Sequence, residues 1–442
     1  MDLIFDHIAP ELFAALLLAT TFAWMLIQGV PISVGIAVSS IVTGMFFLPV
    51  GTAFFIATQK MYSGIDSFTL LAIPFFILSG NLMNKGGIAL RLVKLAKLMG
   101  GRLPGALAHT NVIANMLFGS LSGSSIAAAA AVGGVMGPLQ KREGYDPVFS
   151  ATVNICSAPT GILIPPSGPL ILYSLVSGGT SIAALFVGGY APGILMGLSV
   201  MLVTYFIARK KGYVSDRTAE EKDTTLGIIL GAIPSLLMIV VVIGGIIIGA
   251  FTATEGAAVA ALYSFALSLV YRLAAPREYW DVLKSTAVTS ASILFLIAAS
   301  GIMSYIMTIT GIPDVVADGL RYFSSPAAIL LMMNISLLIV GTFMDLTPAV
   351  LIFTPIFLPI ARDLGVDQVH FGLMMIFNLG IGNITPPVGS VLFVGCSVAR
   401  VTIEQVAREL PAFLVAVVVD LMIVVYWPGL SLALPRAFGL MA

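Results

Sequence analysis

Two similar phrases decide the fold: GILIPPSG, from Gly161 to Gly168, and GNITPPVG, from Gly382 to Gly389. Both ends differ by 221 residues (382 − 161 and 389 − 168), which is half of the 442-residue chain. Each phrase places a Pro-Pro pair in an apolar stretch, where proline removes a backbone donor and disfavours helix in the preceding residue. The sequence therefore predicts two helices that break at matching places in two halves. In membrane proteins this pattern points to a binding site.

Composition indicates an integral membrane protein. Mean hydropathy is +1.06, and 59% of the residues are hydrophobic while only 10% are charged, against about 25% charged residues in a soluble domain. Apolar runs recur that are long enough to span a bilayer. A net charge of zero gives no reason to expect a nucleic-acid partner. Cys156 and Cys396 lie in apolar segments away from other Cys or His residues, so we expect buried inert thiols rather than a metal site.

The apolar runs predict about ten crossings, and two further segments predict re-entrant hairpins. The crossings lie at roughly 12–28, 31–49, 68–84, 147–176, 182–208, 226–249, 254–271, 288–308, 368–399 and 411–430. The hairpins, 105–140 and 326–361, have polar centres: SLSGSS from Ser120 to Ser125, and GTFMDLTP from Gly341 to Pro348. The N-terminus shows no cleavage signal, so we expect the first span to be retained. Gly86 to Met99 predicts an amphipathic helix at the cytoplasmic interface.

Basic residues orient these crossings, because short cytoplasmic loops collect Lys and Arg. With the N-terminus outside, 17 of the 21 basic residues fall inside, and only Lys60, Arg321, Arg362 and Arg436 remain outside. This predicts that both termini face the periplasm and that the two halves are inverted. Inverted repeats allow one central site to open to either side in turn.

The predicted first repeat is 1–208, with scaffold helices in 12–84, hairpin 105–140, broken helix 147–176 and helix 182–208. A cytoplasmic linker, 209–225, follows. The second repeat is 226–442, with scaffold helices in 226–308, hairpin 326–361, broken helix 368–399 and helix 411–430.

Oxygen-bearing side chains gather around the four predicted breaks. Half-helix N-termini favour anions, whereas unwound carbonyls and hydroxyls suit a hard cation such as sodium. The first hairpin and broken helix supply Ser120, Ser122, Ser124, Ser125, Ser157, Thr160 and Ser167, and the second pair supplies Thr342, Asp345, Thr347, Asn378, Asn383 and Thr385. Any single serine could equally make an interhelical hydrogen bond. Asp345 stands out as a sodium ligand or tip-fixing acceptor, because a carboxylate is costly inside a membrane.

No Arg or Lys lies deep in a predicted span, so a bound anion would depend on backbone amides, hydroxyls and co-bound cations. Glu255 follows Thr252 and Thr254 at a helix start and is predicted to be a cap or gate residue. For Asp420 we expect only an interhelical partner.

Enzymatic function is not expected. His7, His109 and His370 lie at the terminus or near segment ends, and no nucleophile–base pair or paired acids occur at depth. A channel is the harder alternative to exclude, although broken helices in inverted repeats favour alternating access.

Several ordered motifs give the chain a family resemblance. They are AIPFFILSGNLMNKGGIALRL from Ala72, SLSGSSIAAAA from Ser120, GYDPVFS from Gly144, GILIPPSGPLILYSL from Gly161, SIAALFVGGYAPG from Ser181, FTATEGAAVAALY from Phe251 and DQVHFGLMMIFNLGIGNITPPVG from Asp367. Together they resemble the large, DctM-type membrane subunit of tripartite ATP-independent periplasmic (TRAP) transporters along essentially the whole chain.

The resemblance implies an all-α, elevator-type transporter of the ion transporter superfamily. It also implies sodium-coupled import of an organic acid, such as a C4-dicarboxylate, a sugar acid or sialic acid, across the bacterial inner membrane. The implied partners are a small four-helix membrane subunit and a periplasmic substrate-binding protein. The alternative is a stand-alone sodium/anion symporter of the same superfamily, which needs neither partner.

The resemblance places the hairpin tips at Ser120 to Ser125 and Gly341 to Thr347, and the unwound segments at Gly161 to Ser167 and Gly382 to Gly389. The expected substrate-binding residues are Ser120, Ser122, Ser124, Ser125, Thr160, Pro165, Pro166, Ser167, Thr385, Pro386 and Pro387. The expected sodium ligands are Ser122, Ser124, Gly161, Gly341, Thr342, Asp345, Thr347, Gly382, Asn383 and Thr385. Sodium is the coupling ion, and no other cofactor is expected. The alanine run from Ala127 to Ala131 departs from the family pattern and leaves fewer side-chain contacts on the first hairpin.

Overall fold

The structure, a computed structural model, describes residues 9–85, 88–100, 103–213, 225–271, 276–323 and 325–441. Within these ranges the chain is helical and contains no strand. Among the described helices, eight are long and apolar enough to cross a membrane, or up to ten crossings if two bent helix pairs each count as one. The chain is therefore an all-α, multi-pass membrane protein, as the sequence predicts.

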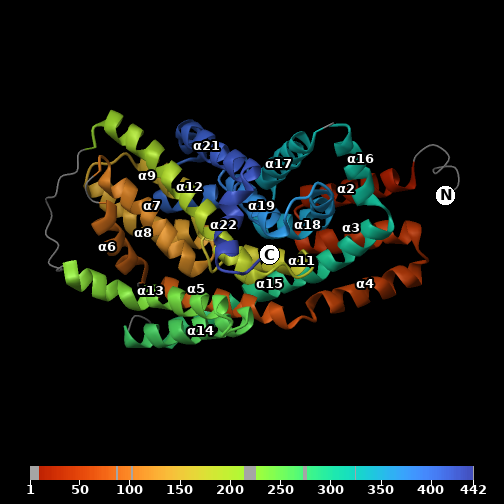
Figure 1. The fold of residues 1–442 in the computed structure, drawn as a ribbon, viewed down its shortest axis with the longest axis horizontal. Coiled ribbons are helices and arrows are strands. Elements are labelled where there is room, and N and C mark those ends of the chain that lie inside the picture. Colours follow the sequence, from red (N-terminus) through yellow and green to blue (C-terminus); the bar gives the residue numbers. More distant parts are fainter. Residues whose placement is uncertain are drawn as a thin grey trace.

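The helices fall into two series of similar order (Figure 1). The first series is α2 (Pro10–Ile27), α3 (Ile32–Phe47), α4 (Val50–Ile65), the 3-10 turn η1 (Phe68–Leu71), α5 (Ala72–Lys85), α6 (Ile88–Gly100), α7 (Ala106–Ser122), α8 (Ser125–Arg142), α9 (Pro147–Ser157), α10 (Thr160–Leu163), α11 (Gly168–Val176) and α12 (Ile182–Lys211). The second is α13 (Thr225–Ile247), α14 (Ala253–Val270), α15 (Pro276–Ile309), α16 (Ile312–Arg321), α17 (Pro326–Phe343), α18 (Leu346–Asp363), α19 (Gln368–Gly382), α20 (Ser390–Ala399), α21 (Ile403–Tyr426) and α22 (Pro428–Ala437).

The 221-residue offset seen in the sequence recurs in the helix bounds. Helix α8 and helix α18 each have 18 residues, and both their first and last residues differ by 221 (346 − 125 and 363 − 142). Asp146 and Asp367, also 221 apart, are both N-cap residues whose side chains accept hydrogen bonds from the first helical turn. The peptide bonds Pro165–Pro166 and Pro386–Pro387 are both cis. The inverted orientation of the two halves stays a prediction.

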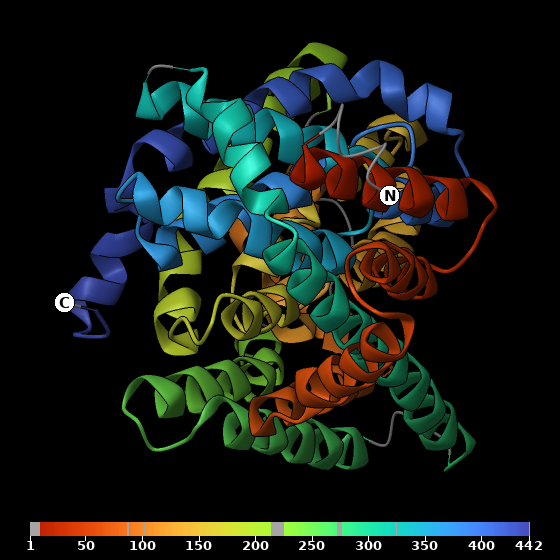
Figure 2. The ribbon, with the colours of Figure 1, turned by 90° about the vertical axis from the view of Figure 1, so that its right-hand side faces the viewer.

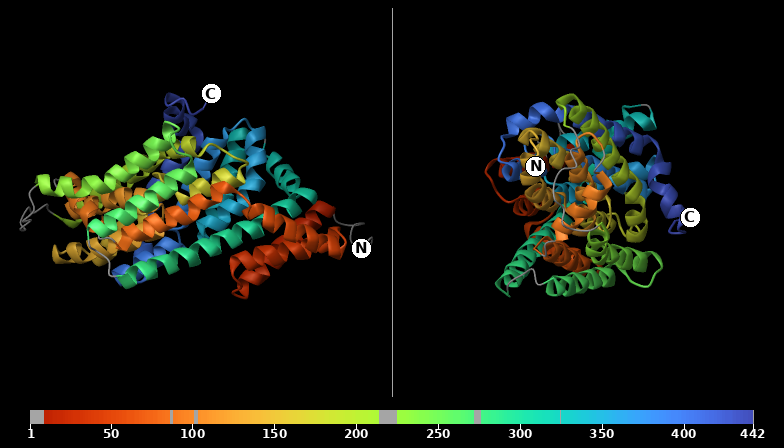
Figure 3. Two further views of the ribbon diagram at one scale, coloured as in Figure 1. Left: turned by 90° about the horizontal axis from the view of Figure 1, so that it is seen from below. Right: turned by 90° about the vertical axis from the view of Figure 1, so that its left-hand side faces the viewer.

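The arrangement has a scaffold layer and a second layer that carries the hairpins and broken helices. Helices α4, α5, α13, α14 and α15 lie side by side along one edge of the molecule (Figures 1 and 3). The broken helices and α17 to α22 lie on the opposite side of this scaffold layer (Figure 2). Small residues allow close packing within the second layer, as is common between membrane helices. A Cβ at Gly372 would lie 2.2 Å from the Tyr173 ring.

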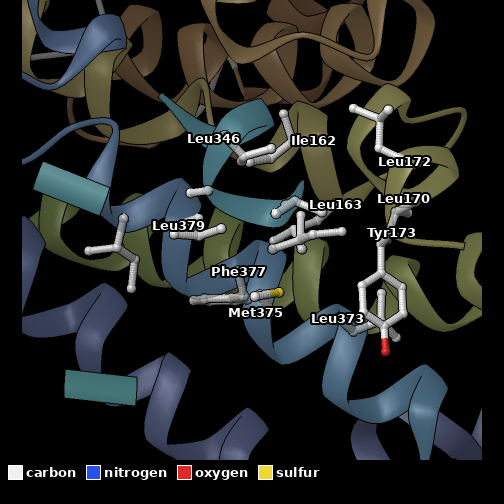
Figure 4. Packing of buried hydrophobic residues seen from close by; sticks show 14 of the residues in the cluster. Ile162, Leu163, Leu170, Leu172, Tyr173, Leu346, Leu373, Met375, Phe377 and Leu379 are labelled. Carbon is white, nitrogen blue, oxygen red and sulfur yellow. The ribbon is translucent and has the colours of Figure 1, made fainter. Parts of the chain in front are cut away.

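The centre of the second layer is built from the two broken helices. Ile162 and Leu163 of α10 and Tyr173 of α11 face Leu373 and Phe377 of α19 (Figure 4), and all five side chains are buried. The Tyr173 hydroxyl donates to the Gln368 carbonyl oxygen at 2.7 Å and so joins the first broken helix to the second.

The structure corrects the sequence prediction at four helices. Residues 50–65, predicted as a loop, form α4, which meets the following helical segment at a 60° bend. Its Gln59 and Lys60 interrupt the apolar run and concealed the helix, but the Lys60 ammonium group lies 4.6 Å from the centre of the Tyr305 ring. Helix α15 begins at Pro276, ahead of the predicted 288, and the unpredicted short helices α16 and α22 follow α15 and α21.

Two predicted polar segments are only partly described. Of the linker 209–225, α12 extends to Lys211, while 214–224 lie outside the described residues, as does His7. The predicted amphipathic helix is α6, whose predicted first residues Gly86 and Gly87 also lie outside. The Arg91 guanidinium lies 3.5 Å from the centre of the Tyr271 ring and donates to the Gly231 carbonyl oxygen at 3.4 Å. Helix α6 is therefore anchored to helix α13 and to the end of α14.

Candidate functional site

The first hairpin turns at a glycine. Helix α7 ends at Ser122, Gly123 takes a left-handed conformation with φ of +62°, and Ser124 caps α8 by accepting from the Ala127 amide at 3.3 Å. The left-handed conformation favours glycine because it lacks a Cβ. A Cβ at Gly123 would also lie 3.0 Å from the Pro166 carbonyl oxygen. The tip of this hairpin therefore lies against the first Pro-Pro break.

The second hairpin turns at Asp345, which occupies the position equivalent to Ser124 (345 − 124 = 221). Asp345 is the N-cap residue of α18, yet its side chain makes no capping hydrogen bond. Instead, Asp345 Oδ1 accepts from the Ser390 hydroxyl at 3.0 Å, at the first residue of α20. The Val388 amide also donates to the Thr342 carbonyl oxygen at 3.2 Å. The Asp345 carboxylate thus joins the second hairpin tip to the second broken helix, as a tip-fixing acceptor would.

Each hairpin packs on its broken helix through a glycine–glycine contact. A Cβ at Gly119 would lie 2.3 Å from Gly161 Cα, and a Cβ at Gly382 would lie 2.6 Å from Gly341 Cα. Asparagine pairs reinforce both contacts: Asn115 Nδ2 donates to Asn154 Oδ1 at 3.0 Å, and Asn378 Nδ2 donates to Asn334 Oδ1 at 2.9 Å. Both hairpins are therefore fixed to their broken helices with little room to move apart.

A cavity of about 300 Å³, here called the tip cavity, opens where the hairpin tips and the broken helices meet the scaffold layer. Seven of the expected site residues line it: Ser122, Ser124, Ser125, Pro166, Asp345, Thr347 and Asn383. The others do not line it: Ser120, Thr160, Gly161, Pro165, Ser167, Gly341, Thr342, Gly382, Thr385, Pro386 and Pro387. Several of these serve local structure. The Thr160 and Ser167 hydroxyls, for example, are buried and donate to the carbonyl oxygens of Ser157 and Ile162.

Scaffold residues that sequence reasoning missed complete the tip cavity. Asn81 of α5 and Thr289 of α15 line it, and Gly80 approaches the first tip so closely that a Cβ would lie 3.1 Å from the Ser122 carbonyl oxygen. Asn81 Nδ2 donates to the Thr286 hydroxyl at 3.0 Å, which holds α5 to α15. An amide side chain inside an apolar helix, directly after the Ser79-Gly80 pair that recurs at Ser300-Gly301, was the available signal.

The tip cavity is rich in oxygen atoms and poor in charge. Among the described residues that line it, Asp345 is the only ionisable side chain. The first turns of α8, α11 and α18 line it as well, through Ser125, Gly168 and Thr347, so three positive helix ends meet there. The buried Asn383 side chain lines the cavity, and its Oδ1 atom has no hydrogen-bond donor. This arrangement can hold an anion at helix ends and a hard cation at oxygen ligands.

The remaining acidic and thiol candidates lie outside this cavity. Glu255 and Thr252 form a capping box at the start of α14, which accounts for Glu255 as a cap. Asp420 Oδ1 accepts from the Ser199 hydroxyl at 2.7 Å, so the expected interhelical partner lies on α12. Cys156 and Cys396 are buried free thiols, and no cluster of three or more metal-ligating side chains occurs in the described ranges.

Comparison with known proteins identifies the family. Residues 19–430 match the model of the tripartite ATP-independent periplasmic transporter, DctM component. The chain belongs to the DctM family. One DctM relative, uncharacterized protein YgiK of Salmonella typhimurium, is 50% identical over 98% of this chain and 99% of its own length. The C4-dicarboxylate TRAP transporter large permease protein DctM of Pseudomonas aeruginosa is 41% identical over 86% of this chain and 89% of its own.

A solved structure supports the fold of this DctM-family chain. The crystal structure of the Alcanivorax borkumensis YdaH transporter matches with a TM-score of 0.65 over 96% of this chain and 98% of that one, at 13% identity. At this identity the likeness concerns the fold alone. The chain is therefore a large permease subunit of the TRAP type, with the all-α fold of a membrane transporter.

Proposed function

We propose that this subunit imports a small organic acid anion across the bacterial inner membrane, coupled to sodium, with the tip cavity as its site. The observation that carries the proposal is the meeting of three helix N-termini with Asp345 and the unpartnered Asn383 Oδ1 in one cavity. A carboxylate substrate would take backbone amides and the hydroxyls of the first tip. Because no Lys or Arg among the described residues lines the cavity, bound cations would supply the missing positive charge.

The oxygen atoms suit sodium rather than a transition metal. Asp345, Thr347 and Asn383 offer carboxylate, hydroxyl and amide oxygen, the hard donors that such cations prefer. Sodium bound there would lower the cost of placing an anion in a membrane-buried cavity, and the anion would in turn favour sodium. This reciprocal effect is the thermodynamic basis of coupling.

The volume of the tip cavity favours a small substrate. About 300 Å³ is at the low end of the range for small-molecule sites, and Ile126 and Ala127 of the first hairpin add apolar wall rather than polar contacts. The P. aeruginosa relative carries the name of a C4-dicarboxylate permease. We therefore propose a short mono- or dicarboxylate as the substrate.

The tip cavity also lies between the two layers, which supports an elevator-type movement of the hairpins and broken helices against the scaffold. The close approach of Gly80 to Ser122 would be one of the contacts exchanged. Membership of the DctM family favours the tripartite assembly, with a small membrane subunit and a periplasmic binding protein that delivers the substrate, over the stand-alone symporter.

The test is uptake by proteoliposomes that contain this chain, its small membrane subunit and its binding protein. Radiolabelled succinate and other short organic acids would be supplied with an inward sodium gradient or with potassium in its place. We expect uptake only with sodium and only with the binding protein present. Equal uptake with potassium would refute sodium coupling, and full uptake without the binding protein would favour the stand-alone symporter.

A further inference from the structure

A second cavity of about 340 Å³, here called the base cavity, lies at the opposite end of α8 from the tip cavity. Helix α8 lines it with Gly133, Gly134, Gly137 and Lys141, α9 with Ser150 and Asn154, and the last turn of α20 with Gly395 to Arg400. A Cβ at Gly134 or at Gly137 would meet no atom within 4 Å. The glycines of α8 therefore leave open space beside a polar wall.

Two buried side chains in the wall lack hydrogen-bond partners. Asn111 of α7 is fully buried, and neither its Nδ2 nor its Oδ1 atom has a partner. Ser150 is 6% exposed, and its hydroxyl is also unpartnered. Leaving such groups without a partner costs about 1–3 kcal/mol each. A ligand with polar atoms would satisfy them from within the cavity.

The charge at the base cavity is positive. Lys141 and Arg400 both line it, and within the described part of the chain neither forms an ion pair. Asp146, the acidic residue just before α9, is instead engaged by the Lys211 ammonium group at 2.9 Å and by the Val148 amide at 2.9 Å. Two cationic groups beside amide and hydroxyl donors favour an anion and disfavour a cation.

The equivalent region of the other half is filled, so the fold itself does not require this hollow. At the 221-residue offset, Gly137 corresponds to Leu358, Ser150 to Phe371 and Asn154 to Met375, and these three apolar side chains are buried. Lys141 corresponds to Arg362, which donates to the Ser177 carbonyl oxygen at 3.1 Å. One half therefore has a solid apolar end where the other has a polar cavity with two free basic groups.

We propose that the base cavity binds a small oxyanion, a phosphate or a carboxylate. Lys141 and Arg400 would neutralise its charge, and Asn111 Nδ2 and the Ser150 hydroxyl would donate to its oxygen atoms. The charge distribution places this end of α8 on the cytoplasmic side. The bound anion would bridge α8 of the first half to the end of α20 of the second, and this site is separate from the tip cavity.

Protection of an introduced thiol tests the proposal on the full-length chain in detergent. G134C places a cysteine in the open space, while native Cys156 and Cys396 are buried, and the wild-type chain measures the background labelling. We expect inorganic phosphate or succinate, but not chloride at equal ionic strength, to slow maleimide labelling of G134C. Adding K141Q or R400Q should raise the half-protecting concentration about tenfold each, because a charge-assisted hydrogen bond is lost. R142Q, which removes the neighbouring exposed charge outside the cavity, is the matched control.

A second variant separates this site from the tip cavity and from misfolding. G137L fills the base cavity, so phosphate should no longer raise the thermal unfolding midpoint, while the midpoint without phosphate shows whether the variant folds. D345A in the G134C background should leave phosphate protection unchanged. The proposal fails if chloride protects equally, if K141Q and R400Q leave the half-protecting concentration unchanged, or if D345A abolishes protection. It also fails if only succinate protects and that protection disappears with D345A.

Discussion

The contact between Gly382 and Gly341 predicts a large effect from one added methyl group. In G382A the new Cβ would lie 2.5 Å from the Gly341 carbonyl carbon and 2.7 Å from its oxygen, whereas ordinary contacts begin at 3.4 Å. The second hairpin and its broken helix would therefore have to separate by about 0.9 Å (3.4 − 2.5). The obstructing atoms are backbone, so a side-chain rotation cannot relieve the clash. Overpacking of this kind costs about 1–3 kcal/mol.

This strain should appear in sodium binding as well as in stability. Gly382 directly precedes Asn383, and Gly341 lies four residues before Asp345, so the separation would displace oxygen ligands of the proposed sodium site. If sodium binding must restore the original spacing, 1–3 kcal/mol corresponds to a rise of about 5- to 150-fold in the half-saturating sodium concentration.

The assay is sodium-dependent uptake in the three-component proteoliposomes, with thermal unfolding of the purified chain measured in parallel. G244A is the matched control, because a Cβ at Gly244 of α13 would meet nothing within 4 Å and alanine favours helix. We expect G244A to be at least as stable as the wild type. The reasoning is refuted if G382A matches G244A in both stability and sodium dependence.

Three further predictions concern single side chains. D345N should raise the half-saturating sodium concentration of uptake at least about tenfold, because a charged ligand is lost, while E143Q, an exposed change, should not; equal sodium dependence of the two would remove Asp345 from the site. S199A should lower the unfolding midpoint by an amount equivalent to about 1–3 kcal/mol, since it leaves the buried Asp420 carboxylate without a donor, whereas S199T should retain the bond; unchanged stability of S199A would contradict this role. Single cysteines at Lys141 and Arg362 should react with an impermeant thiol reagent from opposite sides of the membrane, and labelling from one side would overturn the inverted orientation.

The helix breaks could be predicted from the sequence because their causes are local. Proline removes a backbone donor wherever it lies, so the breaks after Thr160 and after Gly382 follow from the Pro-Pro pairs alone. The polar tips at Ser122 and Asp345 stand out for the same reason, since hydroxyl and carboxylate groups are conspicuous in apolar helices. These features fix where the tip cavity forms.

The direction in which each side chain points could not be predicted in the same way. Ser124 and Ser167 are chemically alike, but Ser124 lines the tip cavity while the buried Ser167 hydroxyl donates to the Ile162 carbonyl oxygen. Asn81 reaches the tip cavity only because α5 packs against the first hairpin at Gly80. The base cavity likewise depends on how α20 of one half meets α8 of the other. Such facts depend on contacts between distant segments, which no local pattern contains.

The hydrogen bond between Ser199 and Asp420 joins two positions that are each other's equivalents (420 − 199 = 221). Equivalent positions can touch only where the axis relating the two halves passes, so α12 and α21 cross on that axis. In a symmetric dimer of half-length chains, the same place would bring a residue against its own copy, and two buried aspartates there would repel each other. A single chain escapes this constraint, because its two halves can diverge and place a donor opposite an acceptor.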